Sequence, residues 1–406
     1  MQSIQQYSIH SNLVSNHLAA QPLPKPAIFI NTFCKGCPVY TYRHPSYNTY
    51  NAIPYLYWRQ LINHSGTKEY TETYNFLNEL TKINTTLYNN ITNNTAVYNN
   101  PVYHIYTRKR MLRDIRTEQT YRRTINPSVN NNERIIDTDQ LVSDMPSLTG
   151  CQGDIVAALH SPQDYITDLQ LYSQNMYQYC HNQHNIQFVY NIYPQSIIKS
   201  PDNSNTIQSI QCLDNQLITA DQYIINDSIV CRQLLPVYYT NQSIQLIRQH
   251  TLRFTSKFRP GTVISKPEQY IDITQLNEDS DIIVTYQREL INTPNLLPDS
   301  IDTVYRMNDE LIRSSCIAIQ SIYPQITVDD ISNHGQQQPI VSLTSITPDG
   351  IPLIGAIQPY TNLYCNLAHG MYSNTLIQIT ALLIAQIVAK QDTIINTNKV
   401  NPNRVL

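Results

Sequence analysis

Apolar residues recur every three to four positions in several stretches of this chain, and that spacing predicts amphipathic helices. In the range 161–180, residues Ile166, Leu169, Met176 and Cys180 share one helical stripe. A second helix is predicted from Thr303 to Tyr323, where Pro324 ends it, and the most apolar stretch, Thr375–Ala389, predicts a buried helix.

Shorter runs of alternating or continuous apolar residues predict strands. The sequence predicts strands in the ranges 102–107, 185–192 and 362–367. It also predicts a hairpin over 205–226 that turns at Asp214–Asn215, and two strands over 259–287 that flank Asn277–Ser280. Because strands gather in the middle of the chain while helices alternate with strands elsewhere, we expect an α/β fold: a parallel-sheet domain with an antiparallel sheet inserted.

The first hundred residues are rich in loop signals, since six prolines between Pro22 and Pro54 break any long element. Short helices are expected at Ala52–Ile62 and from about Glu69 to Asn90. Another helix is expected over 109–123. Further on, Thr138 or Asp139 is expected to cap a helical turn that Pro146 stops.

Composition narrows the classes of function. The net charge is -3 and charged residues make up only 14% of the chain, so there is no basic footprint for nucleic acid. Thr375–Ala389 is too short to span a membrane, and the first residues have neither the basic start nor the apolar stretch of a signal peptide. We therefore expect a protein of the cytoplasm or of the cytoplasmic face of a membrane.

The 8 cysteines are scattered along the chain, and a single Cys-x-x-Cys pair is formed by Cys34 and Cys37. One such pair without a second is a weak signal for zinc, because a structural zinc site needs four ligands. We expect reduced thiols and no metal site.

Glycine is scarce, with 9 in the whole chain, yet two of them fall in Val341–Ile357, at Gly350 and Gly355. The run Thr347-Pro348-Asp349-Gly350 has the composition of a type I turn, with proline setting the backbone angle that the turn needs. By itself this run predicts no more than a turn between a loop and a strand.

The spacing of the following motifs adds a resemblance. After the Thr-Pro-Asp-Gly turn come Ile351-Pro352-Leu353-Ile354-Gly355, then Asn362-Leu363-Tyr364, and then Ala368-His369-Gly370 ahead of the final helix. In this order the chain resembles the D-amino-acid oxidase superfamily of flavoproteins, and most closely its bacterial D-amino-acid dehydrogenases, over roughly Val102 to Lys390. Pro236-Val237-Tyr238 matches a further motif of that family.

The resemblance implies an FAD-binding domain interleaved with an antiparallel substrate domain. The expected segments are a loop-rich region at 1–100, substrate-domain segments at 101–149 and 233–340, and FAD-domain segments at 150–232 and 341–406. The flavin-facing positions it implies are Pro348, Asp349, Gly350, Gly355, His369, Gly370, Asn374 and Thr375. Backbone N–H groups of Asn374 and Thr375 would stabilise the reduced flavin, and the glycines would let the backbone approach the ring.

The reaction implied by the resemblance is oxidation of a D-amino acid to a 2-oxo acid, with hydride passing from Cα to flavin N5 and electrons then passing to a quinone or another acceptor. No side-chain base is required, so no catalytic residue is assigned. Tyr270, on a predicted substrate-domain strand, is a candidate to line the substrate pocket, with a core or surface position as its alternative.

The chain departs from the family at chemically important positions. The G-x-G-x-x-G fingerprint that approaches the FAD pyrophosphate occurs nowhere in it, and the first 149 residues hold only Gly36 and Gly66. We therefore expect the first βαβ unit of the FAD domain to be missing. Thr344 and Ser345 stand at the family's Arg-Pro, where arginine clamps the substrate carboxylate.

Family glycines are replaced by Ser228, Ala368 and Ser373, and the family tryptophan by Asn374. Two hypotheses follow. The chain is either an FAD-dependent oxidoreductase with an altered site, or a truncated or degenerate non-catalytic homologue, such as a structural subunit of a larger assembly. A partner chain that supplies the missing unit is a third option.

Overall fold

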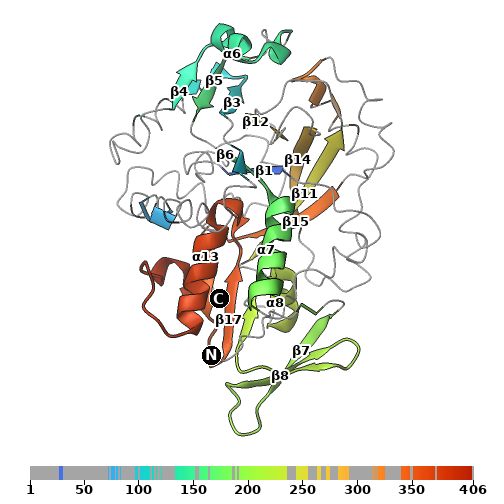
Figure 1. Ribbon diagram of the computed structural model, residues 1–406, viewed down its shortest axis with the longest axis vertical. Helices are drawn as coiled ribbons and strands as arrows, with labels where there is room; N and C mark the ends of the chain where they lie inside the picture. The colour runs from blue at the N-terminus through green and yellow to red at the C-terminus, as the bar shows by residue number, and fades with distance from the viewer. Residues whose placement is uncertain are drawn as a thin grey trace.

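The fold was analysed in a computed structural model. It describes the backbone of residues 27–30, 97–98, 101–109, 133–150, 155–162, 165–184, 188–189, 192–235, 244–254, 263–266, 271–274, 282–291, 319–324, 340–347, 351–370 and 373–404, and helical residues within 72–83, 112–120 and 313–317. In Figure 1 a large sheet occupies the upper half of the molecule, and a smaller sheet with helix α13 occupies the lower half.

The large sheet has eight strands in the order β15-β11-β14-β13-β12-β3-β5-β4. These are β3 (Val102–Tyr106), β4 (Arg134–Ile136), β5 (Ala157–Ser161), β11 (Gln245–Phe254), β12 (Val263–Lys266), β13 (Ile271–Thr274), β14 (Ile282–Ile291) and β15 (Ile340–Ile346). Every neighbouring pair is antiparallel except β12 and β3, which are parallel. This sheet is the antiparallel layer expected from the clustered strands.

The smaller sheet is the centre of a three-layer α/β arrangement. Its strands are β10 (Tyr223–Ile225), β17 (Leu363–Leu367) and β16 (Leu353–Ala356), and β10 runs parallel to β17. Tyr364 packs with α13 (Ser373–Val388), whereas Leu363 and Cys365 pack with α8 (Ser228–Leu234). Because successive side chains of a strand point to opposite faces, β17 is apolar on both sides, as a strand between two helices must be.

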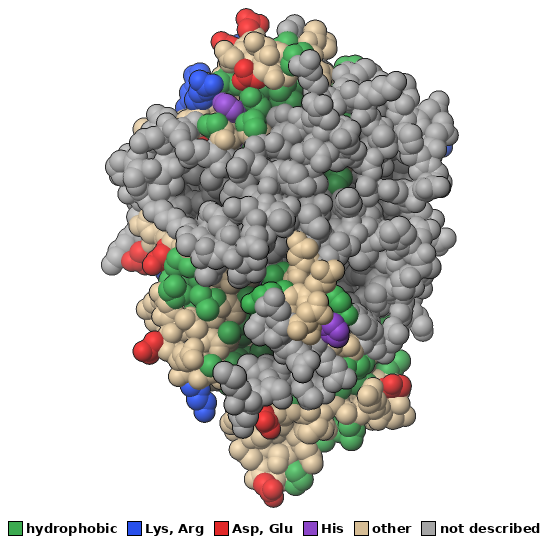
Figure 2. Space-filling model, in the orientation of Figure 1, with side chains coloured by type: hydrophobic (Ala, Val, Ile, Leu, Met, Phe, Trp, Pro, Cys, Tyr) green, Lys and Arg blue, Asp and Glu red, His purple; other side chains and the backbone are tan. Residues whose placement is uncertain are grey.

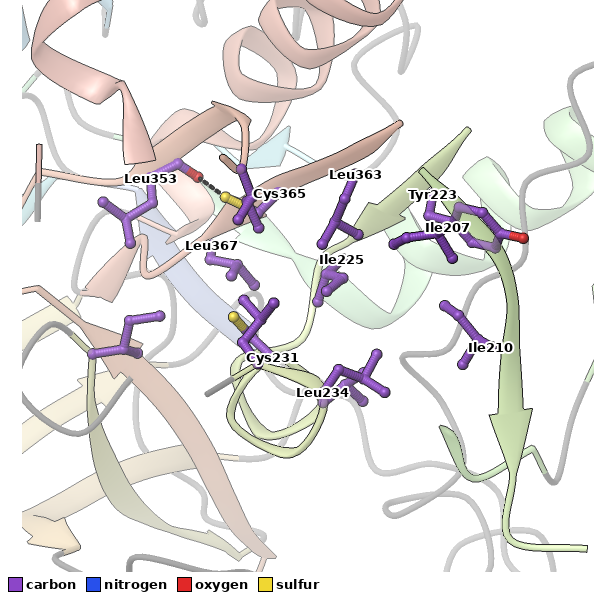
Figure 3. Packing of buried hydrophobic residues seen from close by; sticks show 14 of the residues in the cluster. Ile207, Ile210, Tyr223, Ile225, Cys231, Leu234, Leu353, Leu363, Cys365 and Leu367 are labelled. Atoms are coloured by element: carbon purple, nitrogen blue, oxygen red, sulfur yellow. Dashed lines mark hydrogen bonds between the residues drawn. The ribbon is translucent and has the colours of Figure 1, made fainter. Parts of the chain in front are cut away.

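Figure 3 shows the α8 side of this sheet, where Cys231 and Leu234 approach Ile225 and Leu367. The thiol of Cys365 donates to the carbonyl of Leu353 across the β16–β17 pair at 3.7 Å. Burial, with Asp227 nearby, raises the pKa of the Cys231 thiol to about 12, so this thiol is neutral and packs as an apolar group.

The remaining elements form two small sheets and several helices. One sheet contains β7 (Pro194–Lys199), β8 (Ile207–Cys212) and β9 (Leu217–Ile218), and the other contains β1 (Ala27–Ile30), β6 (Tyr165–Asp168) and β2 (Val97–Tyr98). The other helices are α6 (Thr138–Asp144), α7 (Leu169–His184) and the 3-10 turns η4 (Pro146–Leu148), η6 (Asn398–Val400) and η7 (Pro402–Arg404).

The order of the elements confirms the α/β fold class and its interleaving. Strands of the large sheet come from 102–161 and 245–346, while those of the smaller sheet come from 223–225 and 353–367. The absence of the first βαβ unit stays a prediction. Among the described residues, no helix has the length and apolarity to cross a membrane. In Figure 2, acidic side chains gather at the top of the visible face and the other coloured charges are scattered.

Two predicted helix starts were wrong. Asp137, not Thr138 or Asp139, caps α6, because its Oδ1 accepts from the backbone N–H of Gln140 at 2.9 Å. Helix α7 starts at Leu169, and the preceding Tyr165–Asp168 is strand β6. There the β-branched Ile166 and Thr167 pair with β1 and β2, so tertiary pairing overrides the helical spacing.

Two other predicted elements differ at their ends. The described residues Phe188, Val189 and Ile192 of the predicted strand 185–192 belong to no strand. In the helix predicted from Thr303 to Tyr323, the described helical residues end at Gln320, and Ser321 and Ile322 form a turn. The predicted helix Ala52–Ile62 and the turn Asn277–Ser280 lie outside the described residues.

Candidate functional site

The motifs of the C-terminal third lie where the eight-stranded sheet meets the smaller sheet of the three-layer domain. Strand β15 leaves the eight-stranded sheet at Ile346, which forms an isolated antiparallel bridge with His369 at the end of β17. The next strand along the chain after β15 is β16 of the smaller sheet. The segment from Ser345 to the start of α13 therefore connects the antiparallel sheet to the three-layer domain.

A hydrogen bond joins Thr347 and Ile351, the described residues on either side of Pro348–Gly350. Thr347 is fully buried, and its hydroxyl donates to the carbonyl of Ile351 at 2.8 Å. Pro348, Asp349 and Gly350 themselves lie outside the described residues, so their proposed contact with a flavin stays a prediction.

The two described glycines of this segment contact the chain's own side chains. Gly355 has φ +141°, and a Cβ there would lie 3.2 Å from Cδ of Pro402. Gly370 has φ +56°, and a Cβ there would lie 3.3 Å from Cγ1 of Ile346. Glycine is needed at both positions for its backbone freedom, and at Gly355 the close approach is to the C-terminal turn η7.

Ala368, at a position where the resembling family has glycine, has a backbone conformation that glycine favours. Its φ is 59°, in the left-handed region that residues with a Cβ rarely adopt. Ala368 is buried in the core, with 1% of its surface exposed. An L-residue in this conformation carries a steric cost of about 1–2 kcal/mol. The turn before α13 therefore keeps a glycine-like conformation without a glycine.

We expect Ala368→Gly to raise the free energy of unfolding by about 0.5–1 kcal/mol, because relief of the left-handed strain exceeds the greater entropy of glycine in the unfolded chain. Urea unfolding followed by circular dichroism measures the change. Ala157→Gly is the control, since Ala157 is equally buried within strand β5 and should lose stability. A loss of stability in Ala368→Gly would contradict the strain argument.

Four further site residues are placed in part. The ring Nε2 of His369 hydrogen-bonds Oδ1 of Asn366 at 3.0 Å, so the imidazole is held against the end of β17. Asn374 and Thr375 are in the first turn of α13, as the resemblance implied, with their side chains outside the described set. Thr344 lies in β15 opposite Ile247, and Tyr270 is outside the described residues.

Two departures from the family motifs are brought together by the fold. The hydroxyl of Ser228, at the start of α8, donates to the hydroxyl oxygen of Ser345 in β15 at 2.6 Å. These residues are 117 positions apart in the chain. The sequence identified both as substitutions at family Gly and Pro positions, but no local pattern could show that they are partners.

The sequence analysis also missed the C-terminal segment 398–404. The guanidinium of Arg404 donates to the carbonyl of Ile351 at 2.8 Å, and the side chain of Asn403 bridges the carbonyl of Ala356 and the N–H of Gln358. Strand β16 is at the edge of its sheet, so these groups cover backbone atoms that a neighbouring strand would otherwise pair. Its sequence, Asn-Lys-Val-Asn-Pro-Asn-Arg, has no periodic apolar pattern.

The described residues fit the ring end of FAD but provide no counterpart to its pyrophosphate cradle. The ring end keeps the bridged β15 terminus, the left-handed backbone at Ala368 and Gly370, and the first turn of α13. The glycine-rich fingerprint that cradles pyrophosphate is absent from the sequence.

Known proteins share both sequence and fold with this chain, although no family model matches it. It is 26% identical over 268 residues to a D-amino acid dehydrogenase of Neisseria gonorrhoeae (strain NCCP11945), covering 64% of this chain and 57% of that protein. It is 23% identical over 259 residues to the D-amino acid dehydrogenase of Neisseria meningitidis serogroup C (strain 053442). The match thus spans little more than half the length of these relatives.

Solved structures agree on the fold. Iminodiacetate oxidase from Chelativorans sp. BNC1 matches with a TM-score of 0.62 at 14% identity, covering 90% of this chain and 87% of that one. Glycine oxidase from Bacillus cereus ATCC 14579 matches with a TM-score of 0.59 at 14% identity, covering 79% and 85%. The chain therefore shares its fold with these oxidases and is similar in sequence to D-amino acid dehydrogenases.

Proposed function

We propose that this chain is an FAD-dependent oxidoreductase that oxidises the Cα–N bond of an amino acid, with a D-amino acid as its substrate. The observation that carries the proposal is the joint retention of sequence and site architecture. The 268-residue match is to D-amino acid dehydrogenases, and the β15 terminus, β16, β17 and α13 meet at one junction.

The chain's own groups would orient the cofactor and exclude water. Backbone N–H groups in the first turn of α13 present partial positive charge, which favours an anionic flavin. The bridge between Ile346 and His369 holds that turn against β15, and the core under β17 keeps the junction dry. When bound, FAD would supply the two-electron acceptor, and hydrolysis of the product imine would give the 2-oxo acid.

The small-molecule partners follow from this chemistry. An amino acid gives up two electrons, and a quinone or another acceptor must take them from the flavin in each turnover. Since the glycine-rich fingerprint occurs nowhere in this sequence, a partner subunit that supplies the pyrophosphate cradle is part of the proposal.

A second candidate function is a non-catalytic role as a structural subunit. It is favoured by the substitutions at the Arg-Pro positions, where Ser345 is tied to Ser228 and Thr344 has no guanidinium to clamp a carboxylate. The two candidates differ in one measurable property, which is saturable binding of FAD.

We expect purified protein titrated with FAD to quench flavin fluorescence saturably and to give a structured visible spectrum. Anaerobic D-alanine should then bleach the bound flavin, with L-alanine as the matched control. A titration that shows no uptake of FAD would contradict the oxidoreductase proposal and favour the structural role. Flavin that binds but is bleached by neither alanine would refute alanine as a substrate, and a panel of larger D-amino acids would follow.

A further inference from the structure

Segment 398–404 lies along the outer edge of strand β16. Just after that strand, Ile357 donates its backbone N–H toward β17, so its neighbours Ala356 and Gln358 direct their backbone groups to the opposite edge. On that edge the side chain of Asn403 donates to the carbonyl of Ala356 at 2.9 Å and accepts from the N–H of Gln358 at 3.0 Å. One side-chain amide therefore makes the bonds that a neighbouring strand would make.

Arg404 covers the same strand near its start. Its guanidinium donates to the carbonyl of Ile351 at 2.8 Å and to the carbonyl of Pro352 at 3.5 Å. Val400 and Pro402 anchor the segment, since both are buried and Val400 belongs to the apolar cluster of α13. The segment is thus held by apolar side chains and turns polar ones toward the backbone of the strand.

Strand β16 has no protection of its own against pairing with another chain. Its sequence is Leu-Ile-Gly-Ala, without a charge or a proline. A strand edge exposes N–H and C=O groups that pair readily with another strand, and proteins prevent this with charged residues or prolines in the strand or with a loop that covers it. Segment 398–404 therefore supplies what the strand lacks.

We propose that segment 398–404 is an edge cap, which keeps two copies of this chain from pairing through β16. The chain that it excludes is a second copy, because four uncharged residues provide no repulsion between identical edges. Two such edges would pair antiparallel about a two-fold axis, the commonest symmetry of homodimers. The inference is independent of the proposed function, since it requires no FAD.

The test is sedimentation velocity of wild type and the double variant Asn403→Ala/Arg404→Ala over a range of protein concentrations. We expect the double variant to form concentration-dependent oligomers that wild type does not form, and Asn403→Ala alone to show a smaller shift. Gln140→Ala is the control and should sediment as wild type. It removes an exposed amide bonded to Asp144 on α6, far from β17 and its partner strand in Figure 1.

A third substitution shows where the double variant associates. Ala356 is exposed at the end of β16, and a lysine there would oppose pairing because strand edges with charges pair poorly. Adding Ala356→Lys should restore the wild-type sedimentation, whereas an added charge would not reverse a loss of folding. If the double variant does not fold, Asn403→Ala with and without Ala356→Lys gives the same comparison. Folded variants that sediment as wild type at every concentration, or oligomers that Ala356→Lys leaves unchanged, would overturn the inference.

Discussion

Replacing Asn362 with alanine should lower the free energy of unfolding by about 3–4 kcal/mol, because it leaves buried backbone groups without partners. The Oδ1 of Asn362 accepts from the N–H of Ile207 at 2.9 Å, and its Nδ2 donates to the carbonyl of the same residue at 2.9 Å. Ile207 is 2% exposed, so water cannot take over these bonds. The side-chain amide thus pairs with the backbone of β8 as a neighbouring strand would, and it links β8 to the residue before β17.

Asn403 offers a matched control for this prediction. Its side chain also accepts from one backbone N–H, of Gln358, and donates to one carbonyl, of Ala356, but at the exposed surface. Asn403→Ala should cost about 1 kcal/mol, because water replaces the lost partners. Chemical denaturation of both variants gives the comparison, and equal losses would show that burial at Asn362 adds nothing.

The second large effect is expected at Gly355. Gly355→Ala should lose about 2–4 kcal/mol, since an L-residue is strained at φ +141° and its Cβ would lie 3.2 Å from Cδ of buried Pro402. Pro402 belongs to a turn held by Arg404 and Asn403, so it has little room to move. Differential scanning fluorimetry and urea unfolding both measure the loss.

The variant Gly150→Ala separates the effect of backbone strain from the effect of the contact with Pro402. It has φ +112°, and a Cβ there would have no atom within 4 Å, so Gly150→Ala carries backbone strain without the steric contact. The difference between the two variants is the contribution of Pro402, and a double variant with Pro402→Ala should recover part of it. If Gly355→Ala instead kept its stability and lost FAD binding, Gly355 would act on the flavin as the family resemblance first implied.

Much of the fold was predictable because it rests on local patterns. The strand at β3, the β8–β9 hairpin with Asn215 in the left-handed region, and the apolar helix α13 all follow from alternation, turn chemistry and continuous apolarity. The motif order from Thr347 to Gly370 indicated the family resemblance, and the described part of that segment contains strands β16 and β17, which pair with each other.

The failures share one physical cause. Tyr165–Asp168 has residues that suit either a helix or a strand, and its pairing with β1 and β2 decides the outcome. The sequence also could not show that Pro402, almost fifty positions later in the chain, lies beside Gly355, whose contact with a flavin stays a prediction. The spacing of apolar residues shows which conformations a segment can adopt. It does not show which distant segments that segment will contact.

The sequence by itself therefore indicated the class of the fold, the order of its elements and the resemblance to flavoprotein dehydrogenases, and it contains no glycine-rich fingerprint. Two hydrogen bonds were decided by the tertiary structure alone. Ser228 bonds to Ser345, 117 positions later in the chain, and the side chain of Asn362 bonds to the backbone of Ile207, 155 positions earlier. Such hydrogen bonds form when folding closes long loops around a shared core, so their geometry depends on the packing of the whole chain.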